Sequence, residues 1–188
     1  MHLVRGVGIN DKKHTKSYRE YNLWLNMLGR CYSKRFHEKQ PTYKDCTVSE
    51  NFKYYSYFYE WCQNQVGFNS DGWHLDKDLL IKGNKRYSED VCVFLPEEVN
   101  KLLERRNKMR GDLPIGVSFS KAAGRYMACL SVNGKQEYIG LFFCEKEAFL
   151  AYKKRKEYHI KTIATKYKGE IDDRAYQALM MYSIDIND

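Results

Sequence analysis

The sequence predicts an α+β fold, with N-terminal helices around a two-strand and helix element, followed by a three-stranded antiparallel sheet with its own helix. Three patterns predict it. Apolar residues recur at helical spacing from about Ser17 and again over residues 47–65. Two short apolar runs then flank a Gly-Asn turn, and a helical pattern opens at Pro96. From Pro114 onward, apolar and polar residues alternate through three segments before the pattern becomes helical.

The N-terminal part is predicted to hold an arm and two helices. Residues 1–16 contain glycine, charge and few apolar side chains, so we expect an extended or flexible arm. From about Ser17 an apolar helix face is formed by Tyr21, Trp24, Leu25, Leu28, Cys31 and Tyr32. A capping box of Thr47 and Glu50 predicts a second helix over residues 47–65. Its many tyrosines are typical of core packing, although such density also suits base stacking.

Residues 73–103 place carboxylate and amide side chains on neighbouring elements. The first strand carries Asp76 and Asp78, the second strand covers residues 92–95, and Asn100 lies near the start of the following helix. A strand carboxylate and a helix amide can meet around one divalent ion. Metal-assisted attack on a DNA phosphate requires such an ion.

Residues 17–110 therefore resemble the ββα-metal module of phage-type homing endonucleases of the HNH class. The resemblance implies that Asp76 and Asn100 hold Mg²⁺ or Mn²⁺, with Asp78 as a third ligand. It also places Lys77 at the position of the general base, where the family usually has histidine. An ordinary lysine is protonated at neutral pH, so Lys77 would be a poor base.

His74 is a second candidate for that catalytic role, because it is the only imidazole near these carboxylates. Alternate residues of a strand share a face, so His74 is expected to point with Asp76 and Asp78, and Lys77 to point away. A bulge would change which side chains converge. The alternative is a solvated hairpin face without metal, with Asn100 capping or bridging a loop.

Residues 114–168 are predicted to form a separate module. Strands are expected over residues 116–120, 125–132 and 136–143, with turns at Ala123-Gly124 and Asn133-Gly134, and a helix begins near Glu145. Asn-Gly is the strongest short hairpin signal. The matching pattern comprises Gly116, Val117, Arg125, Tyr126, Ala128, Gly140, Phe142, Glu147, Ala148, Ala151 and Tyr152.

This pattern is similar to that of an AP2 domain, with Tyr126 in place of the usual tryptophan. Such a domain lays one face of its sheet in the major groove of double-stranded DNA. The resemblance implies DNA contacts by Ser118, Ser120, Lys121, Arg125 and Lys135. The alternative is a sheet-and-helix module without a ligand.

The charge of the chain favours a polyanionic partner. Lys and Arg number 32 against 24 Asp and Glu, which gives a formal charge of +8 and predicts salt-sensitive binding. Contacts with the DNA backbone are expected from a basic run in the helix and linker between the two modules, Lys101, Arg105, Arg106, Lys108 and Arg110, and from a second run at residues 153–156. Each run could instead be a solvated helix face. RNA binding has no dedicated motif here.

Several classes of site and location are disfavoured. The six cysteines include no Cys-x-x-Cys pair, so neither zinc nor disulfides are expected, and the cysteines read as small buried hydrophobes. No apolar run is long enough to cross a bilayer, and no signal peptide is evident, so we expect a cytoplasmic protein, in the host cytoplasm if it is phage-encoded. Residues 169–188 form an acidic tail with a short helix, which either shields the DNA surface, contacts a protein, or simply caps the chain.

Two functional hypotheses result. In the first, the chain is a metal-dependent DNA endonuclease of the homing or nicking type with an altered general-base position. In the second, it is a catalytically inactive relative that acts by binding DNA or a host protein, as a regulator or inhibitor. Lys77 favours the second hypothesis, because its ammonium would compete with a metal ion. The retained pair of acids and Asn100 favour the first.

Overall fold

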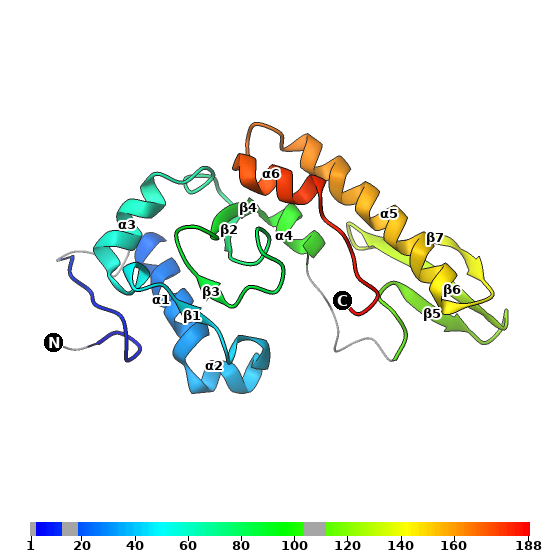
Figure 1. The fold of residues 1–188 in the computed structure, drawn as a ribbon, viewed down its shortest axis with the longest axis horizontal. Coiled ribbons are helices and arrows are strands. Elements are labelled where there is room, and N and C mark those ends of the chain that lie inside the picture. Colours follow the sequence, from blue (N-terminus) through cyan, green and yellow to red (C-terminus); the bar gives the residue numbers. More distant parts are fainter. Residues whose placement is uncertain (1–2, 13–18, 104–111) are drawn as a thin grey trace. The chain divides into compact units, whose positions relative to one another are not determined.

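The computed structural model describes residues 3–12, 19–103 and 112–188. Contacts divide the chain into two compact units, the first made of residues 1–100 and 169–175 and the second of residues 101–168 and 176–188 (Figure 1). Both units combine helices with small sheets, so the predicted α+β class is confirmed.

The helices of the first unit enclose an aromatic core. They are α1 (Arg19–Tyr32), α2 (Lys34–Lys39), α3 (Tyr55–Gln63) and the 3-10 turns η1 (Pro41–Tyr43) and η2 (Asn51–Lys53). Trp24 is fully buried on α1, and its indole nitrogen donates a hydrogen bond to the carbonyl of Phe52 at 2.7 Å. The Phe52 ring in turn meets Phe58 edge to face, with 5.1 Å between centroids. Most of the predicted apolar face of the first helix thus lies in or against the core, whereas Leu25 is only half-buried and lies outside it.

The helix predicted over residues 47–65 is wrong in its first half. Thr47–Val48 is a strand, β1, that pairs in parallel with β3 (Arg86–Tyr87). The Ser49 amide also donates to the Tyr87 carbonyl at 2.8 Å. This partner strand lies almost forty residues further along the chain, so a capping pattern of neighbouring residues gives no sign of the pairing. The helix α3 starts only at Tyr55.

Part of the expected N-terminal arm packs on the first unit. Val4 and Gly8 form an antiparallel bridge, and Ile9 forms a parallel bridge with Tyr54. The Asp11 carboxylate accepts hydrogen bonds from the Ser56 amide at 2.8 Å and from the Ser56 hydroxyl at 2.5 Å, so it caps the first turn of α3. Residues 3–12 are therefore an integral segment rather than a free arm.

A two-strand and helix element follows α3 in the predicted order. The strand β2 (Trp73–Asp76) pairs antiparallel with β4 (Val93–Pro96), so that Asp76 lies opposite Val93, and α4 (Glu97–Leu103) comes directly afterwards. Pro96 ends β4 rather than opening the helix. The strand β2 stops at Asp76, so Asp78 is not on it.

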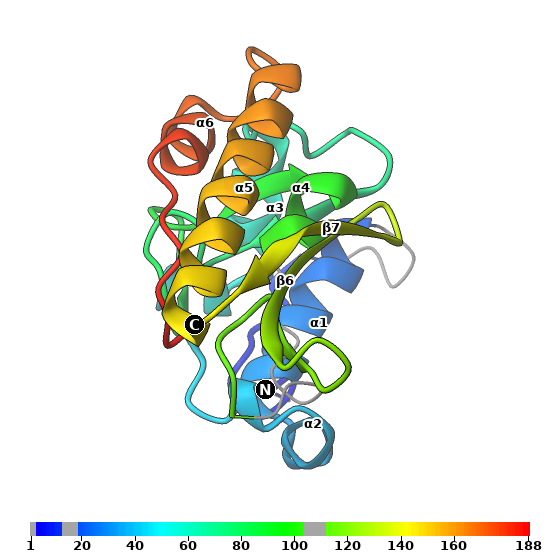
Figure 2. The same cartoon turned by 90° about the vertical axis from the view of Figure 1, so that its right-hand side faces the viewer.

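The second unit contains the predicted meander. Its strands β5 (Val117–Ser120), β6 (Arg125–Val132) and β7 (Lys135–Phe142) form an antiparallel sheet in that order, and α5 (Glu145–Lys166) packs across one face (Figure 2). Asn133 and Gly134 both have positive φ angles, 50° and 77°, as a tight hairpin turn requires. The core between sheet and helix consists mainly of Val117, Ala128, Leu130, Ala148, Phe149 and Tyr152.

The chain after the last helix, α6 (Asp173–Met180), returns along α5 (Figure 1). Ile184 is buried in the core of the second unit. Its amide donates to the Glu157 carboxylate at 2.9 Å, and the Lys153 ammonium donates to the Ser183 hydroxyl at 2.8 Å. These contacts put residues 182–184 on the helix-covered side of the sheet, which does not support an acidic tail laid over the opposite face.

Candidate nucleic-acid and metal sites

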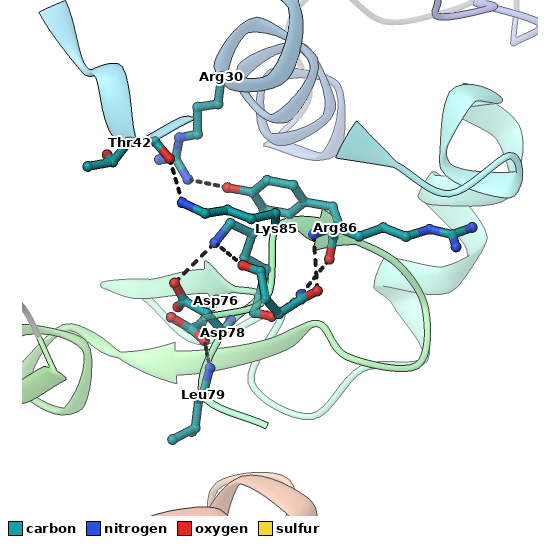
Figure 3. Close-up of polar contacts among 10 residues, drawn as sticks. Arg30, Thr42, Asp76, Asp78, Leu79, Lys85 and Arg86 are labelled. Atoms are coloured by element: carbon teal, nitrogen blue, oxygen red, sulfur yellow. Dashed lines mark hydrogen bonds and ion pairs between the residues drawn. The ribbon is translucent and has the colours of Figure 1, made fainter. Parts of the chain in front are cut away.

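The carboxylate of Asp76 closes the turn after β2. Its Oδ1 accepts hydrogen bonds from the amides of Asp78 at 3.0 Å and Leu79 at 2.8 Å (Figure 3). Burial, and secondarily the nearby Asp78 carboxylate, raise the pKa of Asp76 to about 6. Asp76, which the sequence assigns as a metal ligand, is therefore already bound by two backbone amides, and its ionised form is disfavoured by burial.

Lys77 lies just after the end of β2, so the alternation of strand faces no longer applies to it. Its side chain turns toward Asp78 and toward Asn84 in the following loop. Its ammonium donates to Asp78 Oδ2 at 3.0 Å and to the carbonyl of Asn84 at 2.9 Å. Burial alone would lower the pKa of Lys77, but the charge and hydrogen bond of Asp78, together with weaker contributions from Cys46 and Tyr43, raise the pKa overall. Lys77 stays protonated at neutral pH and cannot accept a proton as a general base.

Asn84, which the sequence pattern marks only as part of a turn, has a structural role. Its Nδ2 donates to the carbonyls of Lys77 and Arg86, both at 2.6 Å, and its Oδ1 accepts from the Arg86 amide at 3.1 Å. The side chain thus ties the two sides of the loop together. The Gly-Asn pair signals a turn, but no local pattern reveals which backbone groups the amide reaches.

His74 and Asn100 stand apart from this cluster. His74 is exposed and pairs with Leu95, while Asn100 is half-buried on α4. Within residues 3–12, 19–103 and 112–188, no hydrogen bond or ion pair joins either of them to Asp76 or Asp78. The same residues contain no group of three or more His, Cys, Asp or Glu side chains placed to hold a metal ion.

Among the described residues of the second unit, α5 packs on one face of the sheet and no helix of that unit packs on the other. Register places Ser118 opposite Met127 and Ser120 opposite Arg125, all pointing away from the core side chain of Ala128. We call this surface the open face; its other strand members are Cys129, Ser131, Gln136, Tyr138 and Leu141. Phe143, directly after β7, lies beside Arg125 at its edge. The open face contains three of the five sheet residues that the AP2-like pattern assigns to DNA.

The other two assigned residues lie elsewhere. Lys121 is exposed in the turn after β5. Lys135 pairs with Val132, whose side chain packs against the core, so register puts Lys135 on the helix side of the sheet. Arg125 has a neighbour that the sequence did not indicate, because its guanidinium carbon lies 4.3 Å from the ring centroid of Phe143.

The basic runs divide by environment. Arg105, Arg106, Lys108 and Arg110 lie outside the described residues. On α5, Lys153 holds the returning chain and Arg155 binds Glu137 with both carboxylate oxygens, at 2.6 and 2.7 Å. Lys156 is half-buried and burial lowers its pKa, whereas Lys154 is exposed. The run at residues 153–156 is therefore not one solvated cationic stripe.

Four of the six cysteines, Cys31, Cys46, Cys62 and Cys92, are buried as expected, whereas Cys129 is half-buried and Cys144 is exposed.

No protein-family model matches this chain, and comparisons with curated proteins and with solved structures gave no significant match. No helix in the described part of the chain combines the length and apolar character needed to cross a bilayer.

Proposed function

We propose that this chain binds double-stranded DNA through the open face of its three-stranded sheet. The observation that carries the proposal is the exposed Arg125, flanked by the Ser118 and Ser120 hydroxyls on a face that α5 does not cover. Guanidinium and hydroxyl groups donate hydrogen bonds, which the phosphate oxygens and base edges of DNA can accept. The AP2-like sequence pattern and the formal charge of +8 support the same partner.

The charge distribution of the sheet adds to this argument. Register assigns no Asp or Glu to the open face within the described strands. Glu137 lies opposite Leu130 on the helix side, where Arg155 neutralises it. A face free of carboxylates presents no repulsion to phosphate, so association with DNA should be favourable at low salt and weaken as salt rises.

Metal-dependent phosphodiester cleavage is a second candidate function. Asp76 and Asp78 lie close enough for one carboxylate to raise the pKa of the other, and a divalent cation such as Mg²⁺ or Mn²⁺ would relieve that repulsion. A base would have to be His74 or water, because Lys77 is protonated. If cleavage is absent, the two-strand and helix element serves as a scaffold, and the chain acts by binding DNA or a host protein.

Binding and cleavage are tested on the full chain. Fluorescence anisotropy with a labelled duplex, across a salt series, should show binding that weakens with salt; Arg125→Ala should raise the Kd several-fold, and Lys154→Ala on exposed α5 surface should change it little. An unchanged Kd in folded Arg125→Ala would remove the open face from the proposal.

A supercoiled plasmid incubated with Mg²⁺ or Mn²⁺, beside EDTA, tests the second candidate. Nicked or linear products that vanish with Asp76→Ala would establish a nuclease. Binding without products would leave a DNA-binding protein, and the absence of both would point to a protein partner.

A further inference from the structure

The ring of Tyr43, at the end of η1, lies among three cations of the first unit. The guanidinium carbon of Arg30 and the ammonium of Lys77 each lie 5.9 Å from the centroid of this ring. The Lys85 ammonium donates to the carbonyl of Thr42, the residue before Tyr43, at 2.7 Å (Figure 3). Positive charges from three separate segments of the chain therefore gather around η1.

Arg30 has no acidic partner in the described part of the chain. It is half-buried in the last turn of α1, and its Nη1 donates to the Tyr87 hydroxyl at 3.4 Å. None of the ion pairs among the described residues includes Arg30. Desolvating a guanidinium costs free energy, which one neutral hydroxyl offsets only in part. Since the group carries five N–H donors, most of them are available to an anion.

Tyr87 restricts the position of the Arg30 side chain. The tyrosine is only 1% exposed and belongs to the aromatic core of the first unit, so the core fixes the place of its hydroxyl. Arg30 is hydrogen-bonded to that hydroxyl before any ligand arrives. Less conformational freedom is then lost on binding, which favours affinity.

The other charged groups of this region differ in how far they are neutralised. The Lys77 ammonium is already bound by Asp78 and by the Asn84 carbonyl. Lys85 is exposed and, like Asp45, takes part in no ion pair among the residues that the structure describes. Arg30 and Lys85 are thus the two cations of the group whose charge no carboxylate there offsets.

The surrounding segment has the same sign of charge. Residues 30–46 contain five Lys or Arg against two acidic residues, Glu38 and Asp45. The four basic residues besides Arg30 are all exposed: Lys34, Arg35, Lys39 and Lys44. Such an excess attracts anions toward Arg30 and Lys85.

We propose that Arg30 and Lys85 form a binding site for a phosphate group, and that Tyr87 is the residue that positions Arg30. A guanidinium can donate two parallel hydrogen bonds to phosphate oxygens, and an ammonium attracts a further oxygen as a point charge. A carboxylate offers only two oxygens in one plane, so it suits two cations from separate segments less well. The phosphate belongs to a nucleic-acid backbone or to a small phosphate ester. All three residues belong to the first unit, so the site does not depend on the open face.

Calorimetric titration of the full chain with inorganic phosphate, beside acetate at the same ionic strength, tests the site. Wild type should bind phosphate at least about fivefold more tightly than acetate, and Arg30→Met and Lys85→Met should each weaken phosphate binding at least about fivefold. Arg35→Met is the matched control, because Arg35 is an exposed arginine of the same basic segment. It should leave the Kd for phosphate within about twofold.

Tyr87→Phe tests the positioning role without removing a charge. The variant keeps the buried ring and loses only the hydroxyl that binds Arg30. It should fold, which a thermal melt verifies, and should bind phosphate more weakly than wild type. Phosphate binding of undiminished strength in folded Tyr87→Phe would overturn the role of Tyr87.

The source of the phosphate is identified by titrating the same variants with a labelled duplex. For a backbone phosphate, Arg30→Met should weaken duplex binding and lower the salt slope of log Kd by about one. For a small phosphate ester, Arg30→Met should weaken the binding of inorganic phosphate and leave duplex binding unchanged. Both results support the site and assign its ligand.

Three results would overturn the phosphate site. Equal losses in Arg30→Met and Arg35→Met would mean diffuse attraction by the basic segment. Acetate bound as tightly as phosphate would indicate an acidic peptide as the ligand. The third is that Arg30→Met changes the binding of neither inorganic phosphate nor duplex, which includes the case in which wild type binds neither.

Discussion

Lys77 and Asn84 bind each other's backbone across the loop that follows β2. The Asn84 side-chain amide donates to the Lys77 carbonyl at 2.6 Å, and the Lys77 ammonium donates to the Asn84 carbonyl at 2.9 Å. Each side chain thus satisfies a backbone acceptor of the other residue. This reciprocal arrangement gives the lysine a structural role at the position where the sequence resemblance expects a catalytic base.

Replacing Lys77 by methionine should destabilise the protein by about 1–3 kcal/mol, because the Asn84 carbonyl and the Asp78 carboxylate lose their buried donor. Urea unfolding followed by circular dichroism measures the change. Lys85→Met is the matched control: Lys85 is exposed and its ammonium donates to the Thr42 carbonyl, so its loss should cost well under half as much. Equal effects would show that the Lys77 contacts add no stability.

Asp76→Asn should stabilise the protein at neutral pH relative to wild type, by up to about 3 kcal/mol. The folded-state pKa of Asp76, about 6, lies above its ordinary value of 3.8, so the folded state binds the proton more tightly. The stability that protonated Asp76 contributes to the wild-type protein is present at pH 4 and is lost as the pH rises through 6. Asparagine does not titrate, so the variant does not lose this stability.

The Asp76→Asn measurement is the difference in unfolding free energy between the two proteins from pH 4 to pH 7. A constant difference would contradict the raised pKa. If Mg²⁺ binds at this carboxylate, adding it at pH 7 should stabilise wild type and leave Asp76→Asn unchanged.

Gly116→Ala should destabilise the second unit by about 2 kcal/mol or more. Gly116 has a φ of 77°, and a Cβ there would lie 2.1 Å from the Tyr152 ring, which is buried in the core. Gly124→Ala is the control, since Gly124 has a φ of 61° but open space around it. A thermal melt should therefore show a clearly larger loss for Gly116→Ala; similar losses would mean that Tyr152 moves aside.

Asp11→Ala should cost about 1 kcal/mol, the usual value of a lost helix cap. Hydrogen bonds from Ser56 outweigh burial and lower the pKa of Asp11, so the stability that this carboxylate contributes is present above its ordinary pKa of 3.8 and lost as the pH falls below it. Chemical unfolding at pH 7 and pH 3 should show a smaller effect of the substitution at pH 3. Asp45→Ala, at an exposed position, serves as the comparison.

Local patterns predicted the second unit well and the first unit less well. The meander follows from strand alternation and from the Asn133-Gly134 turn, both of which involve residues close in sequence. The β1–β3 pair joins Thr47 to Arg86, and no local pattern contains that pairing. The helix predicted from the sequence consequently began at Thr47, within residues that form a strand, instead of at Tyr55.

The candidate metal site was predicted from strand alternation, and alternation fails where β2 ends. Asp76 accepts the amides of Asp78 and Leu79, which bends the chain and brings Lys77 and Asp78 together. The open face was predicted more closely, because three assigned residues share a face by register. The contact between Arg125 and Phe143 was not predicted, since it joins the first residue of β6 to the residue after β7.

The position of Ile184 bears on how the second unit reaches its final state. During synthesis, the sheet and α5 leave the ribosome before the side chain that completes the core between them. A fragment ending at residue 168 lacks that side chain, together with the Ser183 and Ile184 contacts to α5. The second unit therefore depends on a late segment of the chain, and its boundary cannot be drawn at the end of α5.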